Sequence, residues 1–170
     1  MTIDNMKPYE HELVTKGFDG MSVINQNELI AKLANNFGVS YFSVSYFSVE
    51  HSMILDVHKT LKLRLLEEDY RMAIDGGYLD MNSGHLYDMS TESQADFNSV
   101  RILLESKPQE HINWMTEDSG EVSHTSAEWL AVFEGLTICK QELKHKYISL
   151  CKKVTDATSH QEILDIKWDA

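Results

Sequence analysis

Hydrophobic residues recur at three- and four-residue steps in several stretches of the chain, and this spacing predicts amphipathic helices. The longest stretch covers residues 126–157. Its apolar positions are Trp129, Val132, Phe133, Leu136, Cys139, Leu143, Tyr147, Leu150, Cys151 and Val154. Shorter helices are predicted from Asn25 to Gly38, over residues 52–75 before a pair of glycines, from Thr91 to Pro108, and after Ser159.

Two segments between these helices predict β-hairpins, because short apolar runs flank polar turns. The first covers residues 78–89 with a turn at 82–84, and the second covers residues 111–124 with a turn at 116–120. The pattern therefore predicts an α+β fold, in which two β-hairpins pack with helices. A long C-terminal helix is followed by a short one.

Helix starts are predicted where a serine or threonine is followed three residues later by Glu or Gln, which is the capping-box pattern. Thr91, Thr125 and Ser159 have this spacing. Trp168, beyond the last helix, is expected to pack back onto the core.

The N-terminal part of the chain is expected to differ from the rest. Residues 1–20 show little periodicity and contain Pro8, Gly17 and Gly20, so they are predicted to form an arm or an irregular segment. We expect residues 1–50 to be an N-terminal segment with a short helix and an aromatic strand, able to serve as an attachment or interface element. Residues 51–170 are expected to form one α+β domain.

The aromatic strand is predicted at residues 39–49, which are rich in aromatic and β-branched residues and carry no charge. Its repeat of Tyr-Phe-Ser-Val has a five-residue offset, which places bulky side chains on both faces of a strand. Either the strand is covered on both sides or a bulge restores one face, or one face docks against another chain. The candidate protein interface consists of Tyr41, Phe42, Tyr46 and Phe47.

The charge balance narrows the classes of partner. Acidic residues outnumber basic ones 27 to 15, and the net charge of −12 disfavours binding to nucleic acid or to an anionic membrane surface. The acids are scattered rather than aligned, and groups such as Glu117, Asp118 and Glu121 fit solvated turns. No apolar run approaches the roughly 20 residues that span a bilayer, and no secretory signal is expected.

Candidate chemistry is sparse. No nucleophile elbow, phosphate-binding loop, dinucleotide fingerprint or zinc-protease pattern occurs. His58 is expected to be a core or boundary residue. Cys139 and Cys151 are expected to be small buried apolar residues that form no disulfide, because they lie roughly 18 Å apart along one helix. Asp80 and Asp88 flank the first turn. They could face each other across the hairpin, but they are expected to accept hydrogen bonds within the turn rather than act as a general acid and base. We therefore predict no catalytic residues, no metal site, no cofactor and no enzyme activity.

Several short motifs carry a resemblance to a known domain family. They are Ile74-Asp75-Gly76-Gly77-Tyr78, Gly84-His85-Leu86-Tyr87-Asp88, Ser93-Gln94-Ala95-Asp96-Phe97-Asn98, Ile112-Asn113-Trp114 leading to Asp118-Ser119-Gly120, and Ala157-Thr158-Ser159 before Glu162-Ile163-Leu164. In this order they make residues 55–168 similar to a tail-associated domain of unknown function from tailed bacteriophages, encoded near tail-fibre and baseplate genes.

The resemblance implies a non-enzymatic virion or assembly protein of the tail, acting in attachment of the fibre or baseplate or in fibre assembly. Its expected partners are other phage virion proteins and further copies of itself, in the virion or in the host cytoplasm during assembly. An acidic phage inhibitor that binds a host enzyme or defence protein is the alternative.

Overall fold

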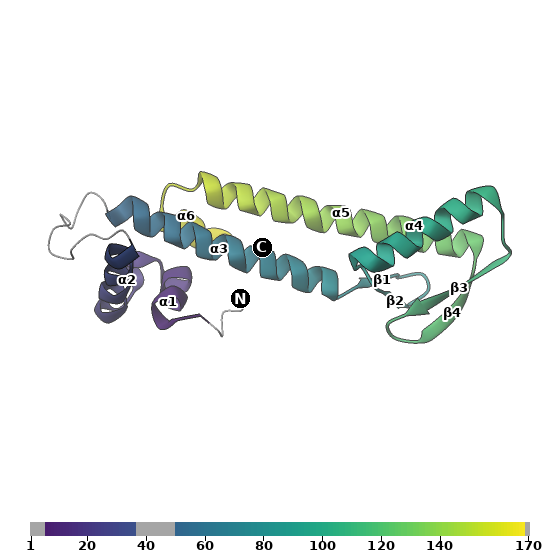
Figure 1. Cartoon of the computed structure of the whole chain (residues 1–170), viewed down its shortest axis with the longest axis horizontal. Helices are drawn as coiled ribbons and strands as arrows, with labels where there is room; N and C mark the ends of the chain where they lie inside the picture. The colour runs from purple at the N-terminus through teal and green to yellow at the C-terminus, as the bar shows by residue number, and fades with distance from the viewer. Residues whose placement is uncertain (1–5, 37–49, 169–170) are drawn as a thin grey trace. The chain divides into compact units, whose positions relative to one another are not determined.

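The computed structural model describes residues 6–36 and 50–168, and Figure 1 shows the order of the elements. They are α1 (Pro8–Lys16), η2 (Phe18–Gly20), α2 (Val23–Asn36), α3 (Glu50–Asp75), β1 (Tyr78–Leu79), β2 (Leu86–Tyr87), α4 (Thr91–Ser106), β3 (His111–Thr116), β4 (Gly120–Thr125), α5 (Ser126–Asp156) and α6 (His160–Asp165). The predicted α+β class is confirmed, as are both hairpins and the long helix followed by a short one.

The chain forms two compact units. Unit 1 contains residues 1–69 and 147–170, and unit 2 contains residues 70–146. Helices α3 and α5 each contribute residues to both units. The boundary expected near residue 50 adjoins residues 37–49, which lie outside the described residues, so the separate N-terminal segment stays a prediction.

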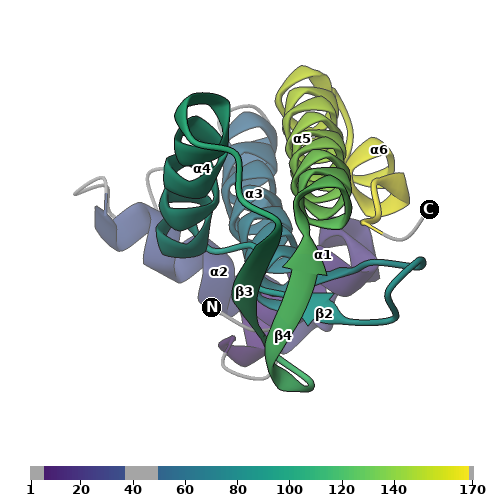
Figure 2. The same ribbon diagram turned by 90° about the vertical axis from the view of Figure 1, so that its right-hand side faces the viewer.

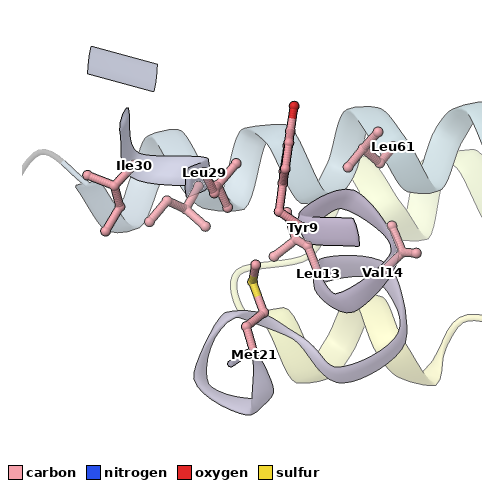
Figure 3. Close-up of a cluster of buried hydrophobic side chains, with 8 residues drawn as sticks. Tyr9, Leu13, Val14, Met21, Leu29, Ile30 and Leu61 are labelled. Atoms are coloured by element: carbon pink, nitrogen blue, oxygen red, sulfur yellow. The ribbon is translucent and has the colours of Figure 1, made fainter. Parts of the chain in front are cut away.

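The first core of unit 1 joins α1, α2 and α3. Leu13 of α1, Leu29 of α2 and Leu61 of α3 are at most 3% exposed, and Figure 3 shows them with Met21, which follows η2. Burying apolar side chains from all three helices removes much of their hydrocarbon surface from water, which is the main force that holds such a small core together.

Helix α1 corrects the prediction of an arm or irregular segment over the part of residues 1–20 that it covers, Pro8–Lys16. Pro8 occupies the first turn, where its missing N–H costs nothing, and the Lys7 N–H donates to the Glu10 carboxylate at 3.0 Å. Tyr9 and Leu13 are four residues apart and both are buried. The helix is only nine residues long, so this stripe is too short to give a clear periodic signal.

A second core of unit 1 gathers around the end of α5. Leu66 of α3, Val154 of α5 and Ile166 after α6 are buried together. Trp168 is partly buried against this cluster, as expected from the sequence.

The two hairpins of unit 2 are antiparallel pairs with defined register. In the first, Tyr78 pairs with Tyr87; in the second, six pairs run from His111–Thr125 to Thr116–Gly120. Figure 2 shows the second hairpin leaving α4 and returning directly into α5. The sequence therefore predicts both hairpins correctly, with strands β3 and β4 slightly longer than expected.

Two glycines allow the first hairpin to pack closely. Gly77 has φ +74°, and a Cβ atom there would lie 2.9 Å from the Tyr87 carbonyl oxygen, so only glycine fits. Gly135 of α5 faces the Tyr78 ring, and a Cβ atom would overlap the Tyr78 hydroxyl group. A glycine inside a long helix, normally unfavourable, is explained by this contact.

An aromatic cluster forms the core of unit 2. The Trp129 ring lies 5.2 Å from Phe97, 5.6 Å from Trp114 and 5.9 Å from Phe133, measured between ring centroids. Trp129, Phe97 and Tyr87 are fully buried. The residues come from α4, β3, α5 and β2, so this one cluster holds the hairpins and helices of the unit together.

Two of the four predicted helix starts are confirmed. The start predicted at Asn25 is wrong, because α2 begins at Val23 and the Ser22 hydroxyl group accepts the Asn25 N–H at 3.4 Å. Thr125 Oγ1 accepts the Glu128 N–H at 3.3 Å while the Glu128 carboxylate accepts the Thr125 N–H at 2.8 Å, and Ser159 Oγ accepts the Glu162 N–H. The prediction for Thr91 is wrong by one residue, because the cap is Ser90, whose Oγ accepts the Ser93 N–H at 3.1 Å. Both positions offer a hydroxyl group, so sequence alone does not separate them.

Candidate functional site

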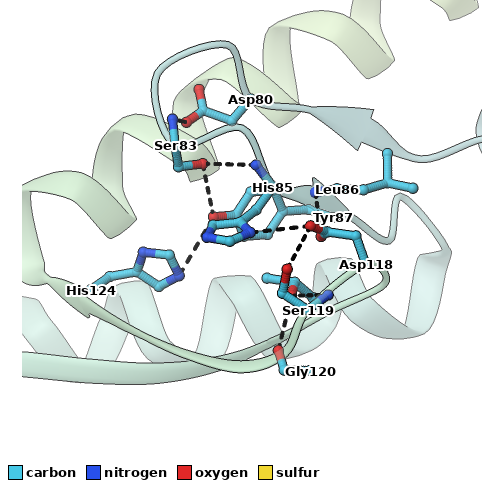
Figure 4. Close-up of polar contacts among 10 residues, drawn as sticks. Asp80, Ser83, His85, Leu86, Tyr87, Asp118, Ser119, Gly120 and His124 are labelled. Carbon is cyan, nitrogen blue, oxygen red and sulfur yellow. Dashed lines mark hydrogen bonds and ion pairs between the residues drawn. The ribbon is translucent and has the colours of Figure 1, made fainter.

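A polar network joins the two hairpins of unit 2 at Asp118, in the turn of the second hairpin (Figure 4). The Asp118 carboxylate accepts the Leu86 N–H at 2.8 Å and lies 3.2 Å from Nδ1 of His85. The neighbouring Glu117 N–H donates to the Leu86 carbonyl at 2.8 Å. The turn of the second hairpin therefore provides hydrogen-bond partners for both the N–H and the carbonyl group of Leu86, which lie on the edge of β2.

The electrostatics of Asp118 follow from these bonds. The Leu86 N–H, then the Ser119 hydroxyl group and the His85 ring, hold the Asp118 pKa well below its usual range. The carboxylate is thus ionised at neutral pH. Its charge stabilises the junction between the hairpins.

A second, buried part of the polar network is centred on the Tyr87 hydroxyl group. The Tyr87 hydroxyl group is 3.3 Å from Ser83 Oγ and 3.5 Å from Nε2 of His124. Burial lowers the pKa of His124, so this ring is neutral at neutral pH. Tyr87 and His124 are at most 4% exposed, and their contact links the first hairpin to β4.

The network lacks a catalytic arrangement among the described residues. Asp118 and His85 form an oriented pair, but Ser83 Oγ accepts the His85 backbone N–H at 3.4 Å and has no hydrogen bond to the His85 ring. Asp80 accepts the Ser83 N–H and Asp88 accepts the Ser90 N–H, each at 2.8 Å. The two acids therefore serve their own turns, as expected from the sequence.

Replacing Asp118 with alanine is expected to lower the urea midpoint of unfolding, because the Leu86 N–H loses its acceptor and the hairpins lose their link. Asp96→Ala is the matched control, since Asp96 is exposed on α4. The midpoint is read from far-UV circular dichroism. Equal midpoints for the two variants would show that the Asp118 link contributes nothing.

The described part of unit 2 also exposes apolar side chains on one face of α5. A shallow groove of about 350 Å³ is lined there by Leu130, Phe133, Glu134, Thr137 and Ile138, and we call it the α5 groove. Leu130 is 41% exposed and Ile138 is 49% exposed. Apolar surface of this kind, grouped rather than scattered, is typical of contact surfaces.

Other exposed apolar side chains lie mainly on unit 2 as well. Within residues 6–36 and 50–168, those of unit 2 outside the α5 groove are Met72, Leu79, Met81, Ile102, Leu103 and Met115. Methionine side chains are flexible and polarizable, so they adapt to partner surfaces of different shape.

The candidate interface residues Tyr41, Phe42, Tyr46 and Phe47 lie outside the described residues, as does the predicted strand at 39–49. His58 is fully buried, as a core residue. Cys139 and Cys151 are free thiols, but the prediction that they are buried is wrong, because both are only partly buried at the edge of the apolar stripe of α5. In the described ranges no three His, Cys, Asp or Glu side chains come together in a way that could hold a metal ion. No helix there is both long and apolar enough to cross a lipid bilayer.

Sequence reasoning missed two features of unit 2. It placed Asp118 in a solvated turn, and nothing in the local pattern indicates that this turn reaches β2. It also left the α5 groove unnoticed, although Leu130, Glu134 and Ile138 follow one another at four-residue steps beside the buried stripe. That spacing was the available signal.

Comparison with known families finds a match over most of the chain. A family described as a domain of unknown function (DUF4376) matches residues 57–167. No curated protein and no solved structure matches the chain. The matched residues include both hairpins, α4, α5 and α6, which hold the polar network and the α5 groove.

Proposed function

The chain belongs to the DUF4376 family, a domain of unknown function, and from this premise we propose that it is a non-enzymatic bacteriophage structural or assembly protein of the tail. It acts through contacts with other virion proteins and with copies of itself. It works in fibre or baseplate attachment or in fibre assembly, and it is located in the virion tail or in the host cytoplasm during assembly.

The α5 groove is the observation that carries a contact function. Its apolar side chains are exposed on a helix whose opposite side already packs into the core through Val132 and Leu136. The net charge of −12 opposes non-specific aggregation through this face, because like charges repel one another. A specific contact forms only where a complementary surface offsets that repulsion.

The tail assignment is supported by the resemblance to a tailed-phage domain. Four of the five motifs that carry it lie in unit 2. There Gly77 packs against Tyr87, Asp118 binds Leu86, and Trp114 lies against Phe97 with ring centroids 4.1 Å apart. These contacts hold the two hairpins of unit 2 against its helices. The motifs therefore support a shared fold, and partner contacts are left to exposed residues.

Ile138→Lys is expected to reduce recovery of the chain with purified phage particles about tenfold, because an ammonium group in an apolar contact must be desolvated. Ile148→Lys is the matched control, since Ile148 is an exposed isoleucine on the same helix and does not line the α5 groove. The chain is quantified by mass spectrometry of particles from a complemented infection.

Absence of the wild-type chain from particles, together with no binding to any virion subunit, would contradict the tail proposal. Equal recovery of the two lysine variants would contradict the role of the α5 groove. Light scattering of the isolated chain tests self-association separately.

The net charge of −12 favours a second candidate, an acidic phage inhibitor that binds a host enzyme or defence protein. Pull-down from uninfected host lysate distinguishes the two. An inhibitor retains one host protein without any phage component and releases it as salt is raised, whereas a tail protein needs a virion subunit.

A further inference from the structure

A polar pocket of about 280 Å³ opens beside the hairpins of unit 2. It is lined by the loop at residues 80–85, by Ser123 and His124 of β4, and by Glu128 of α5. Ala131 and Val132 give it one apolar wall. Ile138 does not line it, so the pocket is distinct from the α5 groove.

The charged groups that line this pocket are acidic. Burial opposes ionisation of Asp80, but hydrogen bonds from Ser83 and Asn82 outweigh it and lower the Asp80 pKa. Hydrogen bonds from Thr125 lower the Glu128 pKa. The described lining contains no lysine or arginine, so at neutral pH two carboxylates face a pocket without an opposing ammonium or guanidinium group.

His124 supplies a second, independent sign that the pocket receives a ligand. Its ring is 4% exposed, and its Nε2 atom is 3.5 Å from the Tyr87 hydroxyl group. Its Nδ1 atom has no hydrogen bond within the described part of the chain, and Figure 4 shows that it points away from Tyr87. This nitrogen is not sealed inside the core, and because His124 lines the pocket, Nδ1 is open to accept a hydrogen bond from a ligand or water.

Acceptor atoms also remain available on the carboxylates. One oxygen of Glu128, Oε2, accepts both the N–H and the hydroxyl group of Thr125, while the described residues offer no donor to Oε1. Oδ1 of Asp80 has a long contact of 3.5 Å with the Asn82 side chain, and the carboxylate also interacts with the Tyr78 hydroxyl group. Asp80, His124 and Glu128, which come from the first hairpin, β4 and α5, therefore all bring acceptor atoms to the lining of one pocket.

We propose that this pocket binds a primary alkylammonium group, with its three N–H donors directed at Glu128, Asp80 and His124. An ammonium group has three donors and no acceptor, which matches the free groups of the pocket. The alkyl stem lies along Ala131 and Val132, as lysine stems commonly do on apolar surface. The group comes from a lysine of a partner protein or from a small free amine. The partner source rests on the proposed function.

The test is a titration of the full chain with n-butylammonium, in which binding is measured by the chemical shifts of the backbone amides. Saturable shifts are expected at Ser83, Ser123 and His124, whereas butyrate and 1-butanol, which share the alkyl stem, give none. Shifts of equal size with 1-butanol would overturn the proposal, because charge would then have no part in binding.

A pair of variants sharpens the titration. Glu128→Gln keeps an oxygen to cap α5 and is expected to weaken butylammonium binding about fivefold, as for loss of one solvent-exposed charge pair. Glu121→Gln makes the same charge change on β4 outside the pocket and leaves binding unchanged. If both variants weaken butylammonium binding equally, the binding depends on the overall negative charge and not on Glu128, and the proposed site is contradicted.

Two further ligands distinguish the sources. N-acetyl-lysine methylamide that binds as tightly as butylammonium supports a partner lysine, while preference for putrescine supports a free amine, and both outcomes support an ammonium site. The Ile138→Lys experiment tests only the α5 groove, because Ile138 does not line the polar pocket. A failed titration therefore leaves the tail proposal standing, and a failed particle assay leaves the ammonium site standing.

Discussion

Trp129→Ala is expected to lower the free energy of unfolding by about 3–5 kcal/mol, as for other large aromatic side chains removed from a core. Trp129 is 0% exposed and its ring lies within 6 Å of three other aromatic rings, measured between centroids. Alanine leaves a cavity where α4, β3 and α5 meet. Urea unfolding followed by far-UV circular dichroism measures the loss.

Trp129→Phe is the matched control for this prediction. It keeps an aromatic ring in the stack and removes the indole Nε1–H, a buried donor with no hydrogen-bond partner in the described part of the chain. The expected loss is no more than about 1–2 kcal/mol, the range for a core substitution that changes volume moderately. A loss as large as that of Trp129→Ala would show that the cluster depends on indole shape and not on aromatic burial.

The elements that the sequence predicts well are those with long repeats or strong local signals. Helix α5 repeats its apolar stripe over many turns, and Thr125 with Glu128 marks its start by purely local hydrogen bonds. Both hairpins are bounded by turns that contain glycine at positive φ, at Gly84 and Gly120. Signals of this kind need no knowledge of distant residues.

The elements that the sequence predicts poorly depend on contacts between distant residues. Helix α1 is defined by burial against α2 and α3, and nine residues hold too few turns to show a period. Asp118 binds a strand 32 residues earlier in the chain, so its role follows from tertiary packing. The pairing of His58 with His160, 102 positions apart, is equally invisible in the sequence.

The His58–His160 pair is the clearest example of such a distant contact in unit 1. The two Nδ1 atoms are 2.9 Å apart, and the rings are stacked with centroids 5.2 Å apart. One Nδ1 must carry a hydrogen and the other must accept it, so the contact requires at least one neutral ring. His58 is 0% exposed, and its Nε2 atom has no hydrogen-bond partner among the described residues.

Acid is therefore expected to destabilise unit 1 through His58. Burial first, and then the nearby His160 and Lys62, lower the His58 pKa from 6.5 to about 4. The unfolded chain binds a proton near pH 6.5 while the folded chain does not, so stability is full above that pH and falls as pH drops toward 4. A shift of this size corresponds to a loss of about 3 kcal/mol, at 1.36 kcal/mol for each pH unit.

His58→Leu is expected to flatten the dependence of the free energy of unfolding on pH between 6.5 and 4, because leucine fills the buried site and takes up no proton. The slope does not vanish, since burial also lowers the His124 pKa and protonation of that ring acts in the same direction. His145→Leu removes an exposed histidine of α5 and should leave the slope unchanged. Urea unfolding at several pH values measures all three chains. If His58→Leu keeps the wild-type slope, His58 is protonated in the folded chain and the buried pair does not control acid stability.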